Sequence, residues 1–437
     1  MPLVRSGLAE AWTTRACGQQ FAVAVVFLFV TLVIVASVSL RGAARVLAVL
    51  QVQLGLPVDV PDWTTGRWWL LRVGLYKLLC PKEEADDWAW LLDHSCQIGS
   101  EKCLVILGVR LRDLPAAGTC LCLEHLEALE ILPVVSSTQE VVAEQLSAVA
   151  ARTGVPRVIV RDGGSDLQGG VERFRALHPQ TADVYDIKHK TACLLRHALE
   201  PDERWGAFSR QVGTTKCQVQ QTELAFLAPP TLRTKARYMN VAELVRWGEE
   251  TLRLLETQPA EVLEHVAPER LEKKLGWLRD FRAPLAEWSE MREVASVAEE
   301  FVRTQGLYLG AAEELADRFP ALTSGTAQRL RDDLLEHVAK QAAQARAGER
   351  LPGSTEALES CFGKLKQLEK DQNRSGFTGL LLGLGALVSK TTVEVVQTAM
   401  EKCPLKAVWK WCKDKLGESV QAQRRAAYAA VGATDSG

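Results

Sequence analysis

The chain has 437 residues, of which 24% are charged and 47% hydrophobic, and its formal net charge is −2. This composition is ordinary for a globular protein and allows two or three domains. The near balance of charge excludes a uniformly basic nucleic-acid-binding protein, so any contact with nucleic acid must come from local basic surface. The eleven cysteines include no Cys-x-x-Cys pair and no zinc-like Cys/His spacing, which fits a reducing compartment.

Residues 21–40 form an uncharged run that follows Arg5 and Arg15. A membrane helix needs about 20 such residues, and preceding arginines are typical of a signal anchor, so hydropathy alone favours a membrane anchor. Two further short helices are expected at 39–50 and 62–79. With these neighbours, we expect residues 21–40 to be the buried first helix of a helical domain rather than a membrane span.

The third of these helices has a plausible N-cap in Asp62. Its first turns would point Thr64, Thr65 and Arg67 outward, as a recognition helix does in the major groove of DNA. We therefore predict a helical, helix-turn-helix-like DNA-binding domain over residues 1–80. An ordinary helical lid is the structural alternative.

Residues 86–200 change character, because short apolar runs here alternate with helical periodicity. The expected order is β-β-β-α-β-α-β-α. Three strands that can form a meander, followed by alternating helices and strands, predict an α/β fold with a mixed sheet and flanking helices. The expected strands are 88–93, 102–111, 119–123, 158–161 and 183–187, and the expected helices are 138–153, 170–177 and 189–199.

Residues 240–350 contain no convincing strand, and Leu, Ala, Glu and Arg recur there at helical spacing. We expect an all-α insertion here, which interrupts a core whose first part covers 86–239. A loop at 347–355 closes the insertion. Residues 351–437 then complete the core with a late helix and a basic C-terminal tail.

Three acidic residues stand in three different settings along this pattern. Asp93 ends the first expected strand, Asp162 follows the strand 158–161, and Glu359 lies on the late helix. Carboxylate oxygens are the ligands that Mg²⁺ prefers. Two such ions held about 4 Å apart stabilise the attacking and leaving oxygens of a phosphoryl transfer. These residue types therefore favour an enzyme that cuts or joins nucleic acid.

The strand order and the place of each acid resemble the ribonuclease-H-like core of DDE transposases, particularly those of insertion-sequence type. In that family the first Asp lies on the first strand, the second just after the fourth strand, and the Glu on a late helix. Two smaller motifs add to the resemblance. Asp186-Ile-Lys-His189 is similar to the Asp-x-x-His motif of several transposase groups, and Lys366 follows Glu359 at a Glu-(6)-Lys spacing.

The resemblance implies metal-dependent DNA cleavage and strand transfer of a mobile element. Asp93, Asp162 and Glu359 would hold two Mg²⁺ ions, with Mn²⁺ as a possible substitute, and His189 and Lys366 would assist catalysis. The implied partner is double-stranded DNA, both the element ends and the target, bound by a homodimer or larger assembly. No small-molecule substrate and no membrane contact are implied, and the implied location is the cytoplasm, with the nucleoid.

Local basic sequence supports DNA contact in two places. Arg233, Lys235 and Arg237 lie within five residues, and Lys364 follows Glu359 on the late helix. The tail from residue 402 to residue 425 adds several lysines and arginines, with Trp409 and Trp411 among them. Runs of charge are also common on solvated faces that bind nothing.

Two other functions remain open from the sequence. One is a transposase-derived protein that binds DNA but has lost catalysis, although such a protein usually lacks one of the three acids. The other is a membrane-anchored protein that uses residues 21–40. Each acid also has a structural alternative, since Asp162 precedes two glycines as a turn residue would and Glu356 is the rival of Glu359 on the late helix.

Overall fold

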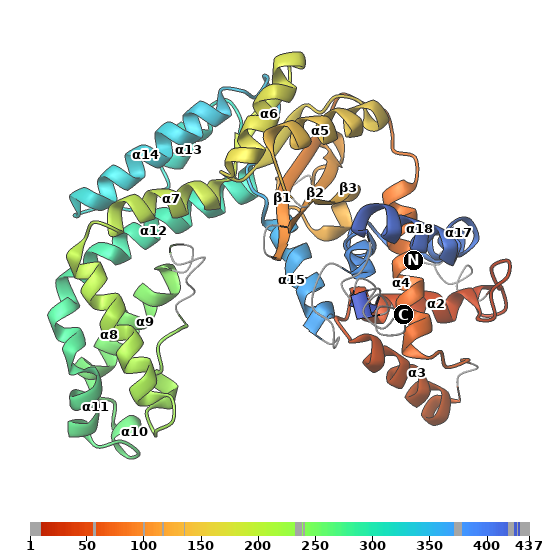
Figure 1. The fold of residues 1–437 in the computed structure, drawn as a ribbon. Helices are drawn as coiled ribbons and strands as arrows, with labels where there is room; N and C mark the ends of the chain where they lie inside the picture. Colours follow the sequence, from red (N-terminus) through yellow and green to blue (C-terminus); the bar gives the residue numbers. More distant parts are fainter. Residues whose placement is uncertain are drawn as a thin grey trace, which may run out of the picture. The chain divides into compact units, whose positions relative to one another are not determined.

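The computed structural model describes residues 10–55, 58–98, 101–115, 118–134, 136–231, 238, 241–370, 378–417, 424–425 and 427–428. The chain divides into two compact units (Figure 1). The first unit comprises Met1–Pro115, Leu121–Asp183 and Thr355–Gly437. The second comprises Ala116–Cys120 and Val184–Ser354. The helical second unit therefore starts well before residue 240, and residues 1–80 share a unit with the sheet.

A five-stranded sheet with the order β3-β2-β1-β4-β5 forms the centre of the first unit. β1 pairs antiparallel with β2 and parallel with β4, and β2 pairs antiparallel with β3. The predicted mixed sheet with flanking helices is therefore confirmed. The strands are β1 (Trp88–Ile98), β2 (Glu101–Arg110), β3 (Glu127–Val134), β4 (Val158–Arg161) and β5 (Ala182–Tyr185).

The third strand does not lie where the sequence predicts it. Residues 119–122 are irregular, a 3-10 turn η2 (Leu123–His125) follows, and β3 begins only at Glu127. The charged Glu130 and the ring of Pro133 interrupt the pattern expected of a strand, so β3 was not predicted from the sequence. Glu130 is nevertheless buried in the sheet, because Arg152 of α5 forms a 3.2 Å ion pair with it.

One face of the sheet is covered by α5 (Gln139–Thr153) and α6 (Ser165–Leu177), the helices that follow β3 and β4. Their apolar residues and alternate strand residues form one buried cluster, because side chains along a strand alternate between the two faces. The cluster contains Trp88, Trp90, Leu92, Leu104, Ile106, Leu129, Val142, Leu146, Val149, Ile159, Leu167, Val171 and Phe174.

Helices from both ends of the chain form the rest of the first unit. The central one is α4, which packs against β3 and against α2, α3, α16, α17 and α18. α16 and α18 also contact β3, and α15 contacts β1. The helices are α2 (Val23–Ile34), α3 (Leu40–Leu54), α4 (Trp63–Leu79), α15 (Glu356–Lys370), α16 (Gly383–Leu387), α17 (Val393–Lys402) and α18 (Leu405–Leu416), with a 3-10 turn η5 (Gly379–Leu382).

α4 carries two buried cations that hold the ends of neighbouring helices. Arg72 donates to the carbonyls of Cys403, at 2.6 Å, and Met400, where α17 ends. Lys77 donates to the carbonyls of Val388, at 2.7 Å, and Ser389, at 3.0 Å, just after α16. Carbonyl groups at a helix end lack partners within their own helix, so the two cations satisfy acceptors that would otherwise be buried without a donor.

The apolar run 21–40 is a packed element of this unit. α2 ends at Ile34, and Ser37 takes a positive φ of 54° before α3 begins. α2 packs against α3, α4 and α17, which agrees with the predicted buried first helix. None of the helices within the described residues has the length and hydropathy needed to cross a bilayer.

Among its described residues the second unit is mainly helical, and its β-structure is the end of β5 at Val184 and Tyr185 and an isolated bridge between Leu307 and Leu351. Trp205, Phe208 and Trp288 meet in its core, with the Trp205 and Trp288 rings 5.0 Å apart. The helices are α7 (Ile187–Leu199), α8 (Glu203–Val219), α9 (Val241–Thr257), α10 (Ala260–Leu263), α11 (Pro268–Leu275), α12 (Arg282–Gln305), α13 (Ala311–Ala316) and α14 (Gly325–Ala342), with 3-10 turns η3 (Ala225–Leu227) and η4 (Gly276–Phe281).

Candidate active site

Asp93 lies midway along β1, just after its parallel pairing with β4 ends, and Asp162 directly follows β4. The register pairs Leu92 of β1 with Arg161 of β4, so each Asp is the next residue along the chain. Neighbouring strands are about 4.8 Å apart, which places the two aspartates side by side. The prediction that Asp162 follows a strand agrees with the structure, whereas the prediction that Asp93 ends the first strand is wrong, because β1 continues to Ile98 as the partner of β2.

The two aspartates have different surroundings. Leu92 points into the cluster under α5 and α6, so Asp93, the next residue of β1, points to the opposite face of the sheet. Asp162 lies beyond the end of β4, and its carboxylate is close to that of Asp166, because a Cβ on Gly164 would lie 3.2 Å from Asp162 Oδ1 and 3.0 Å from Asp166 Oδ1. Each is half-buried, so their carboxylates are sheltered by protein but still reached by water.

Local backbone contacts fix both carboxylates. The amide of His94 donates to Asp93 Oδ1 at 2.6 Å. The amide of Gly164 donates to Asp162 Oδ1 at 2.9 Å, so Asp162 closes the turn that starts α6. The turn alternative for Asp162 therefore describes a real contact, and it is compatible with a ligand role because a carboxylate has two oxygens.

Glu359 lies in the first turn of α15, a helix that packs against β1, η2 and α16. Its neighbours Leu358 and Phe362 are buried, whereas Glu359 is half-buried and its rival Glu356 is exposed. Glu359 thus stands at the margin of the buried face of a helix that contacts the strand of Asp93. This placement favours Glu359 over Glu356 as the third acid.

The acid pair provides the oxygen donors that a hard divalent ion such as Mg²⁺ takes. Asp93 and Asp162 have the chemistry that such an ion takes. Within the described residues, however, His, Cys, Asp and Glu side chains form no group of three or more that could hold a metal. The three-carboxylate set that includes Glu359 remains a proposal.

On the other face, His94 forms a polar cluster that the sequence did not reveal. Its Nε2 lies 3.0 Å from Ser137 Oγ and 3.8 Å from Asp166 Oδ2, and Lys102 Nζ lies 3.1 Å from the same Asp166 oxygen. The only hint in the sequence was the polar residues that follow the apolar runs of β1 and β4. Their convergence depends on strand register and on the start of α6.

Burial lowers the pKa of His94, against the raising effect of Asp166. Burial raises the pKa of Asp166, but hydrogen bonds from Ser137 and Lys102 outweigh it and leave that pKa below the ordinary value. In a Ser-His-Asp triad the Ser and the Asp contact different ring nitrogens. Here both contact Nε2 of His94, so the cluster does not have the geometry of a hydrolase triad.

His189 belongs to the second unit, at the start of α7. The buried Asp186 caps this helix: its Oδ1 accepts from the His189 amide at 2.8 Å and lies 3.1 Å from the His189 ring Nδ1. The Asp-x-x-His motif is therefore a helix-capping pair in this structure. Any role of His189 in catalysis stays a prediction.

The two late-helix lysines differ in their surroundings. Lys364 is half-buried, and its Nζ donates to the carbonyl of Ile34 at 3.2 Å, where α2 ends. Lys366 is exposed. Lys364 would have to leave its carbonyl partner to bind DNA, so of the two only Lys366 already presents its ammonium to solvent.

The predicted recognition helix, α4, is buried along most of its length, from Trp69 to Leu78. Neighbouring helices surround it, so it cannot lie in a DNA groove. Only its first turn reaches the surface, where Thr64 is exposed and Thr65 and Arg67 are half-buried. Arg233, Lys235 and Arg237 lie outside the described residues.

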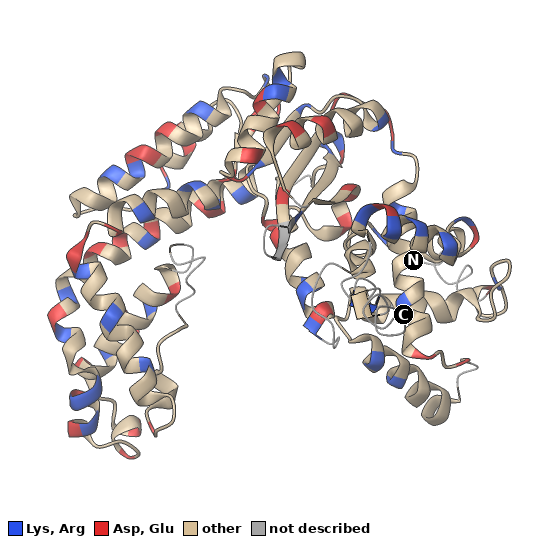
Figure 2. Cartoon of the chain, in the orientation of Figure 1, with Lys and Arg blue, Asp and Glu red and all other residues tan. Residues whose placement is uncertain are grey.

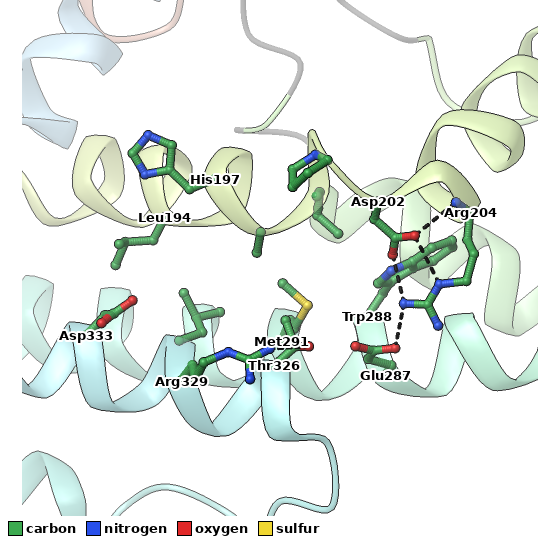
Figure 3. Close-up of a pocket in the computed structure, with 14 residues that line it drawn as sticks. Leu194, His197, Asp202, Arg204, Glu287, Trp288, Met291, Thr326, Arg329 and Asp333 are labelled. Atoms are coloured by element: carbon green, nitrogen blue, oxygen red, sulfur yellow. Dashed lines mark hydrogen bonds and ion pairs between the residues drawn. The ribbon is translucent and has the colours of Figure 1, made fainter.

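A pocket of about 470 Å³ occurs within the second unit, between α7, α8, α12 and α14 (Figure 3). Arg204 pairs there with Asp202 and Glu287, each at 2.9 Å. His197 and Asp333 lie toward the other end of the pocket. The charges of Arg204, Asp202 and Glu287 neutralise one another. The side chains that line the pocket therefore do not favour one chemical class of ligand.

No family model and no curated protein matches the chain. Among solved structures, it is similar to a chain of a Drosophila P element transposase strand transfer complex. The two chains share 11% identity with a TM-score of 0.43, over 92% of this chain and 99% of that one. Similarity at this level does not define function.

Proposed function

We propose that this chain is a DNA-processing enzyme of the DDE transposase class, with a ribonuclease-H-like core. The observation that supports the proposal most is the position of the acid pair, with Asp93 just after the parallel pairing of β1 with β4 ends and Asp162 directly after β4. The placement of Glu359 on a helix packed against β1 adds to it. These are the positions expected of the three acids in that family.

In this proposal Asp93, Asp162 and Glu359 hold two Mg²⁺ or Mn²⁺ ions. Such ions would activate the attacking hydroxyl and stabilise the leaving oxygen of the scissile phosphate. The protein itself contributes position. The two strands fix Asp93 and Asp162 rigidly, and the exposed Lys366 would contribute positive charge toward a phosphate. The expected substrate is duplex DNA, bound by a homodimer or larger assembly.

The test is divalent-dependent nicking of supercoiled plasmid, a substrate that requires no knowledge of the element ends. Asp162→Asn and Glu359→Gln should each abolish nicking, because an amide keeps the shape of the carboxylate but loses its charge. Asp166→Asn and Glu356→Gln are matched controls, four and three residues away, and should retain nicking. Activity that survives in Asp162→Asn would overturn the proposal. If Glu356→Gln loses activity and Glu359→Gln does not, the role of third acid passes from Glu359 to Glu356.

A second readout does not depend on activity. Mn²⁺ binding followed by electron paramagnetic resonance should weaken at least tenfold in Asp162→Asn, because an anionic ligand is removed. Asp166→Asn should bind Mn²⁺ as the wild type does. Duplex binding with neither Mn²⁺ binding nor nicking in the wild type would instead indicate a transposase-derived protein that has lost catalysis.

A further inference from the structure

Helix α18 presents a row of lysines on the surface of the first unit. Its apolar residues Val408 and Trp411 are buried, and the helix packs against α4, β3 and η5. Lys406, Lys410 and Lys413 are exposed at spacings of four and three residues, which places them on one side of the helix. Figure 2 shows Lys and Arg concentrated along this helix.

The preceding turn of α17 extends the row with Lys402, which is also exposed. Lys410 is paired with Asp414 at 2.5 Å. Across the part of the chain that the structure describes, Lys402, Lys406 and Lys413 have no ion-pair partner. We call Lys402, Lys406, Lys410 and Lys413 the α18 lysine row. Its charge is local, because the whole chain carries a formal charge of −2.

An aromatic side chain stands beside the row. Trp409 is 55% exposed, and it lies three residues after Lys406 and four before Lys413, so it borders both. Its ring meets Trp68 of α4 edge-on at 6.0 Å, and the Arg67 guanidinium lies over Trp68 at 5.3 Å. The lysine row is thus continued by an aromatic contact toward Arg67, one of the residues predicted to bind DNA.

We infer that the α18 lysine row binds the phosphate backbone of duplex DNA, an inference that rests on the proposed function and locates one of its DNA-contacting surfaces. Along α18 the rise from Lys406 to Lys413 is about 10 Å. One DNA strand presents about three phosphates over that length. Unpaired lysines on a rigid helix suit this regular row of negative charges. Their contacts with phosphates would not select a base sequence.

A basic helix with tryptophan can also lie on an anionic membrane, where its apolar face enters the lipid. In α18 that face is already used, since Val408 and Trp411 are buried against the protein. Only the charged side remains available. The structure therefore favours a partner recognised by its charge, which the phosphate backbone of DNA provides.

The experiment measures fluorescence anisotropy of a labelled duplex of arbitrary sequence across a salt series. The double variant Lys406→Gln/Lys413→Gln should weaken binding and lower the slope of log K against log salt by about 2, one unit per lost phosphate contact. A second duplex of unrelated sequence should be affected equally. The matched control is Lys273→Gln/Lys340→Gln, two exposed lysines of the second unit, which should keep the wild-type slope.

Circular dichroism and thermal unfolding of both double variants verify that they fold. A wild-type slope in Lys406→Gln/Lys413→Gln, an equal loss in the control, or no duplex binding by the wild type would overturn the inference. The inference would also be overturned if Lys406 and Lys413 were needed for binding to phosphatidylserine vesicles but not for binding to DNA. Asp162→Asn should retain full duplex binding, so a failure of the lysine row is distinguished from a failure of the proposed active site.

Discussion

The contact between α4 and the α16 region should be intolerant of a single added methyl group. A Cβ on Gly74 would lie 1.8 Å from the carbonyl oxygen of Leu382, and a Cβ on Gly385 would lie 2.6 Å from the carbonyl oxygen of Gly74. Both obstacles are backbone atoms, which cannot rotate away as a side chain can. Ordinary contact begins near 3.4 Å, so Gly74→Ala would force the two segments apart by about 1.5 Å.

The expected cost has two parts. Overpacking in a well-packed core destabilises by about 1–3 kcal/mol. Moving α16 would also stretch the contacts of Lys77 with the carbonyls of Ala386 and Val388, and a hydrogen bond to a charged group contributes about 1.5–3 kcal/mol. Alanine recovers about 1 kcal/mol through its higher helix propensity. We expect Gly74→Ala to destabilise the first unit by about 2–4 kcal/mol in total.

Urea unfolding followed by circular dichroism measures this change, with the first unfolding transition compared between variants. The matched control is Gly363→Ala in α15, where an added Cβ would meet no atom within 4 Å. That substitution should stabilise by up to about 1 kcal/mol. The reasoning is refuted if Gly74→Ala unfolds at the same urea concentration as the wild type or at a higher one.

Two further predictions concern titrating groups. Burial, with a smaller contribution from Lys82, lowers the pKa of Lys77 to about 7 from 10.5. Between these two pH values Lys77 is protonated in the unfolded chain but has released its proton in the folded chain. The contribution of Lys77 to the free energy of unfolding therefore rises with pH over this range. Lys77→Met removes this titrating group. The unfolding free energy of the wild type minus that of the variant, measured by urea titration, should therefore rise by up to about 1.4 kcal/mol per pH unit between pH 7 and 9. A difference that does not change with pH would contradict the prediction. Because Asp166 raises the pKa of His94 while burial lowers it, Asp166→Asn should lower the His94 pKa further, and an unchanged imidazole titration by NMR would show that the carboxylate has no influence.

The repeat of apolar residues predicted the elements whose burial does not depend on a charged partner from another element. α5 and β2 lie within one residue of their predicted bounds, and β1 begins where predicted but continues five residues further, to Ile98. α5 has one buried face, and the apolar runs of β1 and β2 are buried on both faces. β3 was missed because it contains the charged Glu130, whose charge is neutralised by Arg152 of α5. No local pattern reports such a partner, since it comes from another element.

α4 shows the same limit more strongly. The sequence predicted a recognition helix with its first turns on DNA, yet Arg72 and Lys77 of this helix are buried against helix ends from the other end of the chain. More than 300 residues separate each cation from its acceptors. The position of Asp162 was more predictable, because it directly follows a short apolar strand, whereas β1 continues five residues past Asp93 through its pairing with β2.

The position of Glu359 depends on contacts remote from it in sequence. α15 packs against β1, which carries Asp93, and against α16. α16 in turn is fixed by its close approach to Gly74 and by its contact with Lys77. An added methyl group at Gly74 should therefore displace the helix of Glu359 as well as reduce stability. In the proposed enzyme, Gly74→Ala should slow nicking while leaving duplex binding through the α18 lysine row less affected, because Asp93 and Asp162 are held by strand pairing and Glu359 by helix packing.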